Sequence, residues 1–303
     1  MINEKWLSDI KIIIFDMDGT LYQEDKFLER YIRHLLAGTE YEGETEAAIS
    51  AGRDILTGKH PFQFGHFYHK QDDLALVRNE DGFVQGYTWE GTAIEERALA
   101  YGALSSQAHH LIQIGDPWGI AAVVSHKYKL PEEKLQSAFK QVRKEMLLAP
   151  YQFELHSGLF EAIEELTATH QIILMTNTFL ESGIDFLNYM KIRHLFEEVY
   201  CGAEKPLGMD NYISTLLAQG YQAREILSIG DNPWNDLHPV KRRGGRTCFI
   251  SPYPSSDPEI WDLRLTSLDE LAQLMQAIRK SITRRPISDG EDRTEAYQQE
   301  IQR

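Results

Sequence analysis

The first chemical feature of the sequence is a pair of carboxylates, Asp16 and Asp18, that directly follow the apolar segment Ile12–Phe15. Carboxylates leaving a strand two residues apart can face one small site, where they repel each other unless a cation or a shared proton relieves them. Gly19 and Thr20 come next, and aspartate and glycine are also common in ordinary turns. The pair therefore predicts either a turn or a small site that holds a cation or a proton.

Other polar residues follow apolar segments in the same way. They are Thr176, Asn177, Lys205, Asp231 and Asp236. Each has an ordinary interpretation when taken alone, because threonine is a good strand former and lysine is usually exposed to solvent. Their meaning therefore depends on whether the fold brings them together.

The elements that must position these residues are short apolar strands that alternate with amphipathic helices. Such alternation is typical of βαβ units, and strands that are apolar throughout are typical of parallel sheets buried on both faces. We therefore predict an α/β fold with a Rossmann-like parallel-sheet core. Ligands of such sheets bind beyond the carboxyl ends of the strands, so the polar residues should converge at one edge. The predicted strands are 12–15, 171–175, 198–201, 226–229 and 246–250.

Residues 21–155 interrupt this alternation. They contain predicted helices around 27–36, 93–101 and 131–148 and a predicted hairpin formed by 74–77 and 83–87. A region of this length cannot be a loop inside one compact domain, so we predict a second, mainly helical domain inserted into the first. The predicted division is a discontinuous core at 1–20 and 156–283, the inserted domain at 21–155 and a solvated tail at 284–303.

The strand-end segments resemble the four motifs of the haloacid dehalogenase (HAD) superfamily, whose members are mostly phosphatases. The matching segments are Asp16-Met17-Asp18-Gly19-Thr20, Ile172-Ile173-Leu174-Met175-Thr176-Asn177, Ala203-Glu204-Lys205-Pro206 and the stretch from Ile229-Gly230-Asp231 to Asp236. The resemblance covers roughly residues 10–20 and 156–280. It implies that the insertion at 21–155 is a cap domain, which the family often places between its first and second motifs.

The resemblance also implies a role for each motif residue. Asp16 would be the nucleophile that forms an aspartyl-phosphate, and Asp18 would act first as general acid and then as general base. The hydroxyl of Thr176 would bind the phosphoryl group. Lys205 would bind it too and balance the negative charge of nucleophile and phosphate. Asn177 is a further candidate for phosphate binding on its position alone, and turn preference explains that residue equally well.

The carboxylates suit Mg²⁺, which prefers oxygen ligands and keeps several waters. Asp16 and Asp231 are the natural side-chain ligands of the ion, and the main-chain carbonyl of Asp18 can complete the set of ligands that the protein supplies. Asp236 would bind the metal directly or through water. The expected reaction is Mg²⁺-dependent hydrolysis of a small phosphomonoester metabolite.

Other functions remain open at this point. A phosphomutase of the β-phosphoglucomutase kind uses the same four motifs, and a regulatory module could bind phosphate without turnover. A dehalogenase is a poorer fit, because its leaving group needs no proton and Asp18 would be idle.

The composition of the chain limits the classes of molecule that the protein is expected to bind. The 303 residues carry 31 Lys and Arg against 46 Asp and Glu, a net charge of −15, which argues against nucleic acids and anionic membrane surfaces. No apolar run approaches the ~18 residues of a membrane span. The two cysteines, Cys201 and Cys248, fit a reducing compartment. We expect a cytoplasmic monomer or homodimer whose partner is a small phosphorylated metabolite, with no nucleic acid and no membrane.

Residues outside the motifs give further hypotheses. Lys127, Arg78 and His69 are candidates for substrate contact from the insertion. The pair His109-His110 lacks the neighbouring carboxylate or cysteine of a zinc site.

The fourth motif has a partial match elsewhere in the chain. Gly115-Asp116-Pro117-Trp118 echoes Gly230-Asp231-Asn232-Pro233-Trp234, and we interpret this short match as a coincidence. Trp234 itself is a packing residue that could also contribute to recognition, because it lies inside the motif loop.

Overall fold

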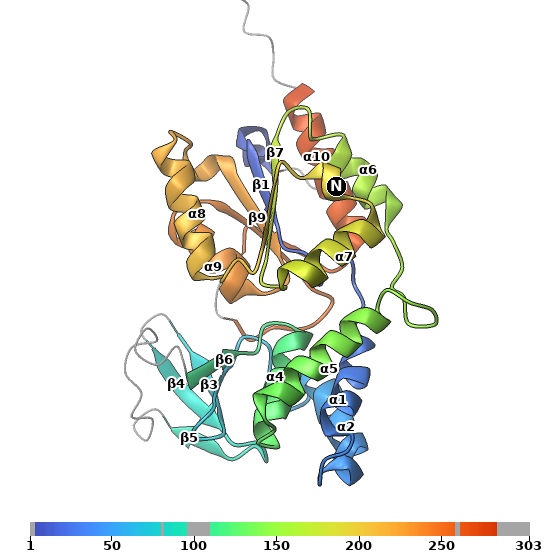
Figure 1. Cartoon of the computed structure of the whole chain (residues 1–303). Helices are drawn as coiled ribbons and strands as arrows, with labels where there is room; N and C mark the ends of the chain where they lie inside the picture. The colour runs from blue at the N-terminus through green and yellow to red at the C-terminus, as the bar shows by residue number, and fades with distance from the viewer. Residues whose placement is uncertain (1–3, 80–81, 96–109, 258–260, 284–303) are drawn as a thin grey trace, which may run out of the picture.

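The structure is a computed structural model that describes residues 4–79, 82–95, 110–257 and 261–283. Figure 1 shows a parallel-sheet core and, below it, a cap that contains both helices and an antiparallel sheet. The predicted tail at 284–303, His109 and most of the helix predicted at 93–101 lie outside the described residues. The beginning of that segment, Ala93–Glu95, is a strand rather than a helix.

The core sheet confirms the predicted parallel arrangement. Its strand order is β11-β10-β9-β1-β7-β8, and every neighbouring pair is parallel. The strands are β1 (Ile12–Phe15), β7 (Gln171–Thr176), β8 (Glu198–Cys201), β9 (Ile226–Gly230), β10 (Arg246–Ile250) and β11 (Leu263–Leu265). The short edge strand β11 was not predicted, because three residues are too few for a periodic pattern.

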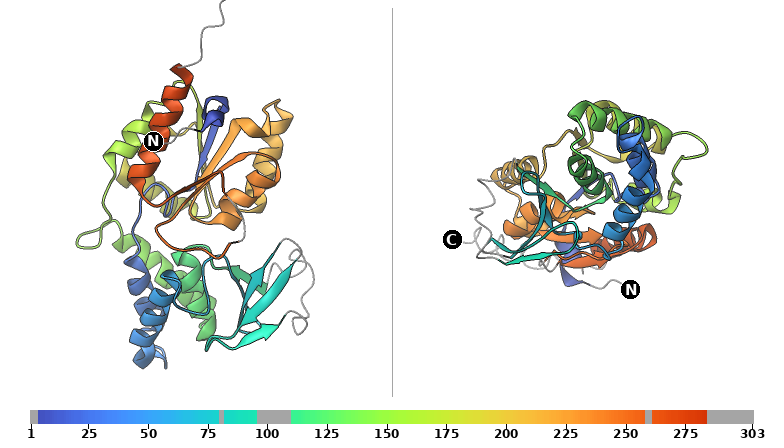
Figure 2. Two further views of the ribbon diagram at one scale, coloured as in Figure 1. Left: turned by 180° about the vertical axis from the view of Figure 1, so that it is seen from behind. Right: turned by 90° about the horizontal axis from the view of Figure 1, so that it is seen from below.

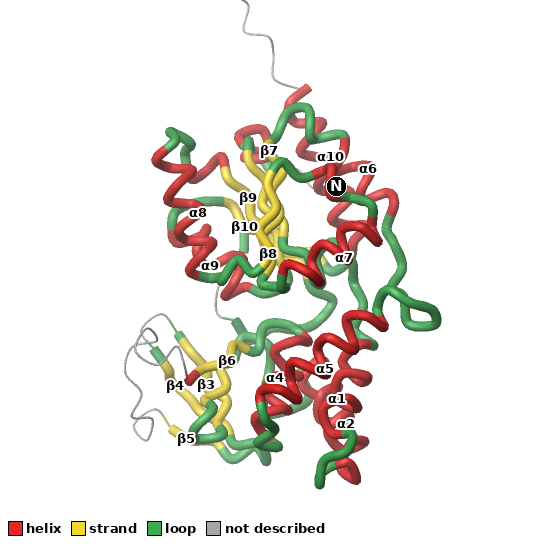
Figure 3. The backbone as a smooth tube through the Cα atoms, viewed as in Figure 1, coloured by secondary structure: helices red, strands yellow, loops and turns green. Residues whose placement is uncertain are grey.

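Helices cover both faces of this sheet, and the alternation of β1 side chains accounts for it. Ile12 and Ile14 belong to the apolar cluster on the side of α8 and α9, whereas Ile13 and Phe15 belong to the cluster on the opposite side. Figure 3 shows the two helical layers with the strands between them. The helices are α6 (Ser157–Glu164), α7 (Leu180–Met190), α8 (Leu207–Ala218), α9 (His238–Arg242) and α10 (Leu268–Thr283).

The helices of the cap form one layer. They are α1 (Phe27–Leu36), α2 (Thr45–Leu56), α4 (Pro117–Lys127) and α5 (Glu132–Glu145). Two of them, α1 and α5, lie within segments predicted to be helical. Across the described ranges, every helix of the molecule is too short or too polar to span a bilayer.

The cap also contains a five-stranded antiparallel sheet, of which only the hairpin β3–β4 was predicted. The strand order is β5-β4-β3-β2-β6, and all pairs are antiparallel. The strands are β2 (Phe67–His69), β3 (Leu74–Arg78), β4 (Phe83–Tyr87), β5 (Ala93–Glu95) and β6 (Leu111–Gln113). The other three strands have only three residues each, so their periodicity carries no signal.

The cap sheet packs directly against the core. The indole of Trp234 meets the ring of Phe67 edge to face, with 5.1 Å between the ring centroids. In β3, the buried Arg78 lies 2.6 Å from His238 Nε2 and 3.6 Å from an Asp257 carboxylate oxygen. The left view of Figure 2, from behind, shows the cap sheet beneath the core, and the right view shows it from below. These contacts hold the cap close to the carboxyl edge of the core sheet.

Candidate active site

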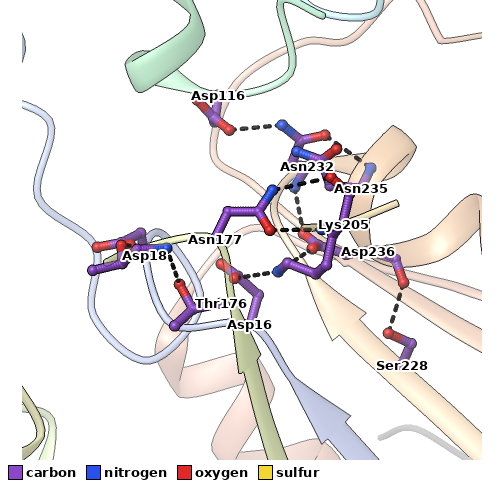
Figure 4. A network of polar contacts seen from close by, with 11 residues as sticks. Asp16, Asp18, Asp116, Thr176, Asn177, Lys205, Ser228, Asn232, Asn235 and Asp236 are labelled. Atoms are coloured by element: carbon purple, nitrogen blue, oxygen red, sulfur yellow. Dashed lines mark hydrogen bonds and ion pairs between the residues drawn. The ribbon is translucent and has the colours of Figure 1, made fainter. Parts of the chain in front are cut away.

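The polar residues singled out in the sequence meet in one cavity at the carboxyl edge of the core sheet. Figure 4 labels all of them except Asp231 and shows the polar contacts that join them to their neighbours. The strands that they follow, β9, β1, β7 and β8, are adjacent in the sheet, so their ends lie side by side. The residues are Asp16, Asp18, Thr176, Asn177, Lys205, Asp231 and Asp236, and we call the space they line the strand-end cavity.

Lys205 bridges two carboxylates at the centre of this cavity. Its Nζ lies 2.6 Å from Asp16 Oδ1 and 2.6 Å from Asp236 Oδ1. Burial alone would lower the pKa of Lys205, but the charges of Asp16 and Asp236 outweigh it and raise the pKa. Burial raises the pKa of Asp16 to about 8 despite the opposing charge of Lys205. Burial thus favours the protonated form of Asp16 even beside the Lys205 ammonium.

Three of the carboxylates form a group that fits a divalent cation. One ligand oxygen from each of Asp16, Asp231 and Asp236 lies within 4.8 Å of the other two. Burial, with the surrounding carboxylates, holds the pKa of Asp231 well above its usual range. A hard cation with oxygen ligands would relieve this repulsion, so the donor set fits Mg²⁺.

Two glycines allow these carboxylates to approach the backbone. Gly19 has φ +74°, and an added Cβ would clash with Asp231 Oδ2. At Gly230, an added Cβ would clash with Asp236 Oδ2. The two motif glycines therefore make room for metal-ligand candidates.

Asp18 faces a different set of groups. Its Oδ2 accepts a hydrogen bond from Thr178 Oγ1 at 2.6 Å, and its Oδ1 accepts bonds from Tyr22 and Arg143. Burial alone would raise the pKa of Asp18, but the Arg143 charge and these hydrogen bonds outweigh it and lower the pKa. Asp18 is thereby held as an anion beside Asp16.

Arg143 reaches Asp18 from the cap. It lies in the last turn of α5, is 3% exposed and also donates to Ser182 Oγ at 2.8 Å. Its guanidinium stacks 3.4 Å above the centre of the Phe186 ring. No signal in the sequence points to this residue, because one arginine among the many charges of α5 has no distinctive spacing.

Thr176 and Asn177 are fixed by neighbouring main-chain groups. Thr176 Oγ1 accepts a hydrogen bond from Thr178 N–H at 3.1 Å, which leaves its own hydrogen to donate. Asn177 Nδ2 donates to the Lys205 carbonyl at 3.1 Å, and its Oδ1 accepts from Lys205 N–H at 2.7 Å. This pair of bonds sets the position of the Lys205 main chain.

The cap supplies a further carboxylate, Asp116. It caps the N-terminus of α4 by accepting from Gly119 N–H at 2.8 Å, and it accepts from Asn232 Nδ2 at 2.6 Å. The two segments with similar sequences thus lie against each other, since Asn232 belongs to the fourth motif. The similarity between these two segments was the one sequence signal that pointed to Asp116. Its interpretation as a coincidence did not foresee the contact between Asp116 and Asn232.

The three cap residues proposed for substrate contact lie elsewhere. Lys127 pairs with Asp73 at 3.1 Å, His69 Nδ1 lies 3.1 Å from Asp72, and Arg78 contacts the core through His238 and Asp257. None of the three lines the strand-end cavity as described. Trp234 packs against Phe67, in line with its interpretation as a packing residue.

Comparison with known proteins agrees with this geometry. A family model described as haloacid dehalogenase-like hydrolase matches residues 10–242, whereas no curated protein matches the chain. Among solved structures, the magnesium-bound HAD-hydrolase YfnB from Bacillus subtilis is similar, with 13% identity, a TM-score of 0.51 and coverage of 88% of this chain and 98% of that one.

A second solved structure is a predicted phosphoglycolate phosphatase from Haemophilus somnus, with 17% identity, a TM-score of 0.48 and coverage of 88% of this chain and 99% of that one. At 13% identity, the YfnB structure shows a shared fold alone. The family match extends over most of the sequence and includes all four motifs. The chain therefore belongs to the haloacid dehalogenase-like hydrolases.

Proposed function

We propose that the protein is a Mg²⁺-dependent phosphatase that hydrolyses a small phosphomonoester through an aspartyl-phosphate on Asp16. One observation carries the proposal. Asp16 lies within a group of three carboxylates that fits a divalent cation, while Lys205 contacts it at 2.6 Å and Asp18 stands two residues away. This arrangement combines a nucleophile, positive charge and an acid–base group in one cavity.

In the first step, a carboxylate oxygen of Asp16 attacks phosphorus and the bond from phosphorus to the ester oxygen breaks. The departing oxygen takes a proton from Asp18, which must be protonated when substrate is bound. This step requires Asp18 to turn away from at least part of its contact with Arg143, Tyr22 and Thr178.

In the second step, water attacks the phosphorus of the aspartyl-phosphate, the bond from phosphorus to the Asp16 oxygen breaks, and inorganic phosphate is released with the Asp16 carboxylate restored. Asp18, now an anion, accepts the proton of that water. The contacts that hold Asp18 ionised in this structure suit the second step, because a general base must be unprotonated.

The remaining residues bind the phosphoryl group and the metal. Thr176 donates its hydroxyl hydrogen to a phosphoryl oxygen, Lys205 balances charge, and Asn177 positions Lys205 and offers its second amide hydrogen. Asp16, Asp231 and Asp236 would hold Mg²⁺ together with the Asp18 carbonyl. The bound ion supplies positive charge to the transferring phosphoryl group.

The test is release of inorganic phosphate from p-nitrophenyl phosphate and from a panel of phosphorylated metabolites, with Mg²⁺ and with a chelator. We expect metal-dependent multiple turnover. Binding without phosphate release would instead identify a regulatory module. Transfer of phosphate between positions of one sugar, with a bisphosphate requirement, would identify a mutase.

A further inference from the structure

A second cavity adjoins the strand-end cavity between the cap and the core, and we call it the side cavity. The two cavities share Asp116, Trp118 and Asp231. Its other walls come from the segment that links β1 to α1, from residues 250–253 at the end of β10 and in the following loop, and from Phe64, Gly115 and Pro117 of the cap. A group that leaves phosphorus at Asp16 would therefore be next to this space.

The side cavity has acidic side chains and no basic ones on its described walls. The carboxylates of Glu24, Asp25, Asp116 and Asp231 line it, and no Lys, Arg or His does. Asp231 is one of the three carboxylates that would hold the metal ion. The other three carboxylates of the side cavity would therefore be available to contact the leaving group of the substrate. Arg30 lies 3.8 Å from Glu24 but does not line the cavity, so it balances one of these charges from outside.

Two further observations show that the cavity is suited to a ligand with hydrogen-bonding groups. Gln23 lines it, and its buried Nε2 has no hydrogen-bond partner in the described part of the chain. An acceptor oxygen on a ligand would satisfy this donor. The rings of Phe27 and Trp118, stacked with centroids 4.0 Å apart, supply an apolar wall for carbon atoms.

We infer that the side cavity selects phosphomonoesters whose leaving group bears a hydrogen-bond donor, a hydroxyl or an ammonium, and rejects those with a second anionic group. The inference rests on the proposed phosphatase function and narrows its substrate class. A donor would meet the oxygens of Glu24, Asp25 and Asp116, whereas a carboxylate or second phosphate would face three carboxyl groups, of which Arg30 balances only that of Glu24.

Three two-carbon esters of nearly equal size test this inference, because they differ mainly in charge. They are 2-hydroxyethyl phosphate, which is neutral beyond the phosphate, O-phosphoethanolamine, which is cationic, and phosphoglycolate, which is anionic. Each is measured as a substrate and as a competitor of p-nitrophenyl phosphate hydrolysis. We expect kcat/KM for phosphoglycolate to be at least about tenfold below that for 2-hydroxyethyl phosphate, and its inhibition constant correspondingly weaker.

The variant Asp25→Asn removes one charge from the cavity. We expect it to raise the ratio of phosphoglycolate to 2-hydroxyethyl phosphate kcat/KM several-fold, while Glu46→Gln, on the exposed outside of the cap, leaves that ratio unchanged. Comparison of the ammonium and hydroxyl esters identifies which donor the cavity prefers. Thermal melting of both variants verifies that they are folded.

The outcomes separate this inference from the proposed function. Hydrolysis of p-nitrophenyl phosphate with equal or better use of phosphoglycolate overturns the charge selection alone. The charge selection is likewise overturned if the three esters compete equally or if Asp25→Asn leaves the ratio unchanged. No Mg²⁺-dependent hydrolysis of p-nitrophenyl phosphate would overturn the phosphatase function, and the inference with it.

Discussion

The core and the cap both contribute polar residues to the strand-end cavity, but they position them in different ways. In the core, Asp16, Thr176 and Asp231 each stand at the end of a strand, and neighbouring strands bring them together. In the cap, Asp116 begins α4 and Arg143 lies in the last turn of α5. Their position depends on how the cap docks, which involves contacts such as Trp234 with Phe67.

This difference indicates that the core and the cap contribute to the reaction in different ways. The core holds the groups that would form and break bonds, and its local geometry is complete within the sheet edge. The cap adds groups that act on those residues from outside, since Arg143 binds Asp18 and Asp116 binds Asn232. Core substitutions should therefore affect turnover of every substrate, whereas cap substitutions should act more weakly.

The largest effect is expected for Asp16→Asn. An amide is a much poorer nucleophile than a carboxylate, so phosphate release should fall by at least about 1,000-fold. The control is Asp185→Asn, an exposed aspartate on α7, which should retain activity. Steady-state kinetics with p-nitrophenyl phosphate measure both, and undiminished turnover by a folded Asp16→Asn protein would exclude Asp16 as nucleophile.

Asp18→Asn should have the next largest effect, and its size should depend on the leaving group. Loss of a general acid typically costs about 100- to 10,000-fold for a poor leaving group such as an alkoxide. The loss should be smaller for p-nitrophenolate, which needs little protonation to depart. The measurement compares kcat for an alkyl phosphate and for p-nitrophenyl phosphate, and equal losses on the two would remove Asp18 from the acid role.

Arg143→Met tests the contribution of the cap. Removing the charged donor that holds Asp18 as the anionic base of the second step should cost about 10- to 100-fold in kcat when that step limits turnover, because such bonds are worth about 1.5–3 kcal/mol. Arg143→Lys should recover part of the loss, since lysine keeps the charge but not the planar geometry that also reaches Ser182. A purely structural role would instead lower the melting temperature equally in both variants without recovery of kcat.

The same difference between core and cap explains which strands and site residues could be predicted from the sequence. Five core strands and the convergence of seven site residues could be predicted, because position after an apolar strand determines position at the sheet edge. Position on a cap helix carries no comparable rule. Arg143 could not be predicted, because its contact with Asp18 depends on tertiary docking between residues 125 positions apart.

The smallest expected effect is the stabilisation of the fold by Mg²⁺, which should depend on pH. The pKa of Asp16 is raised from 3.8 to about 8 in the folded protein, so the folded state keeps a proton that the unfolded chain loses. The contribution of Asp16 to the free energy of unfolding is fully present below about pH 4 and is lost as the pH rises through about 8. Because Mg²⁺ requires the ionised carboxylates, its stabilising effect should increase over the same range.

Thermal melting with and without Mg²⁺ at pH 5.5 and pH 7.5 measures this dependence. At about ten times Kd the ion should add about 1.4 kcal/mol, a shift of about 2–4 °C, at the higher pH and less at the lower pH. Asp231→Asn removes a proposed core ligand and should abolish the shift, whereas Asp116→Asn alters only a nearby cap carboxylate and should retain most of it. Equal losses in the two variants would mean that the cap, and not the core alone, holds the ion.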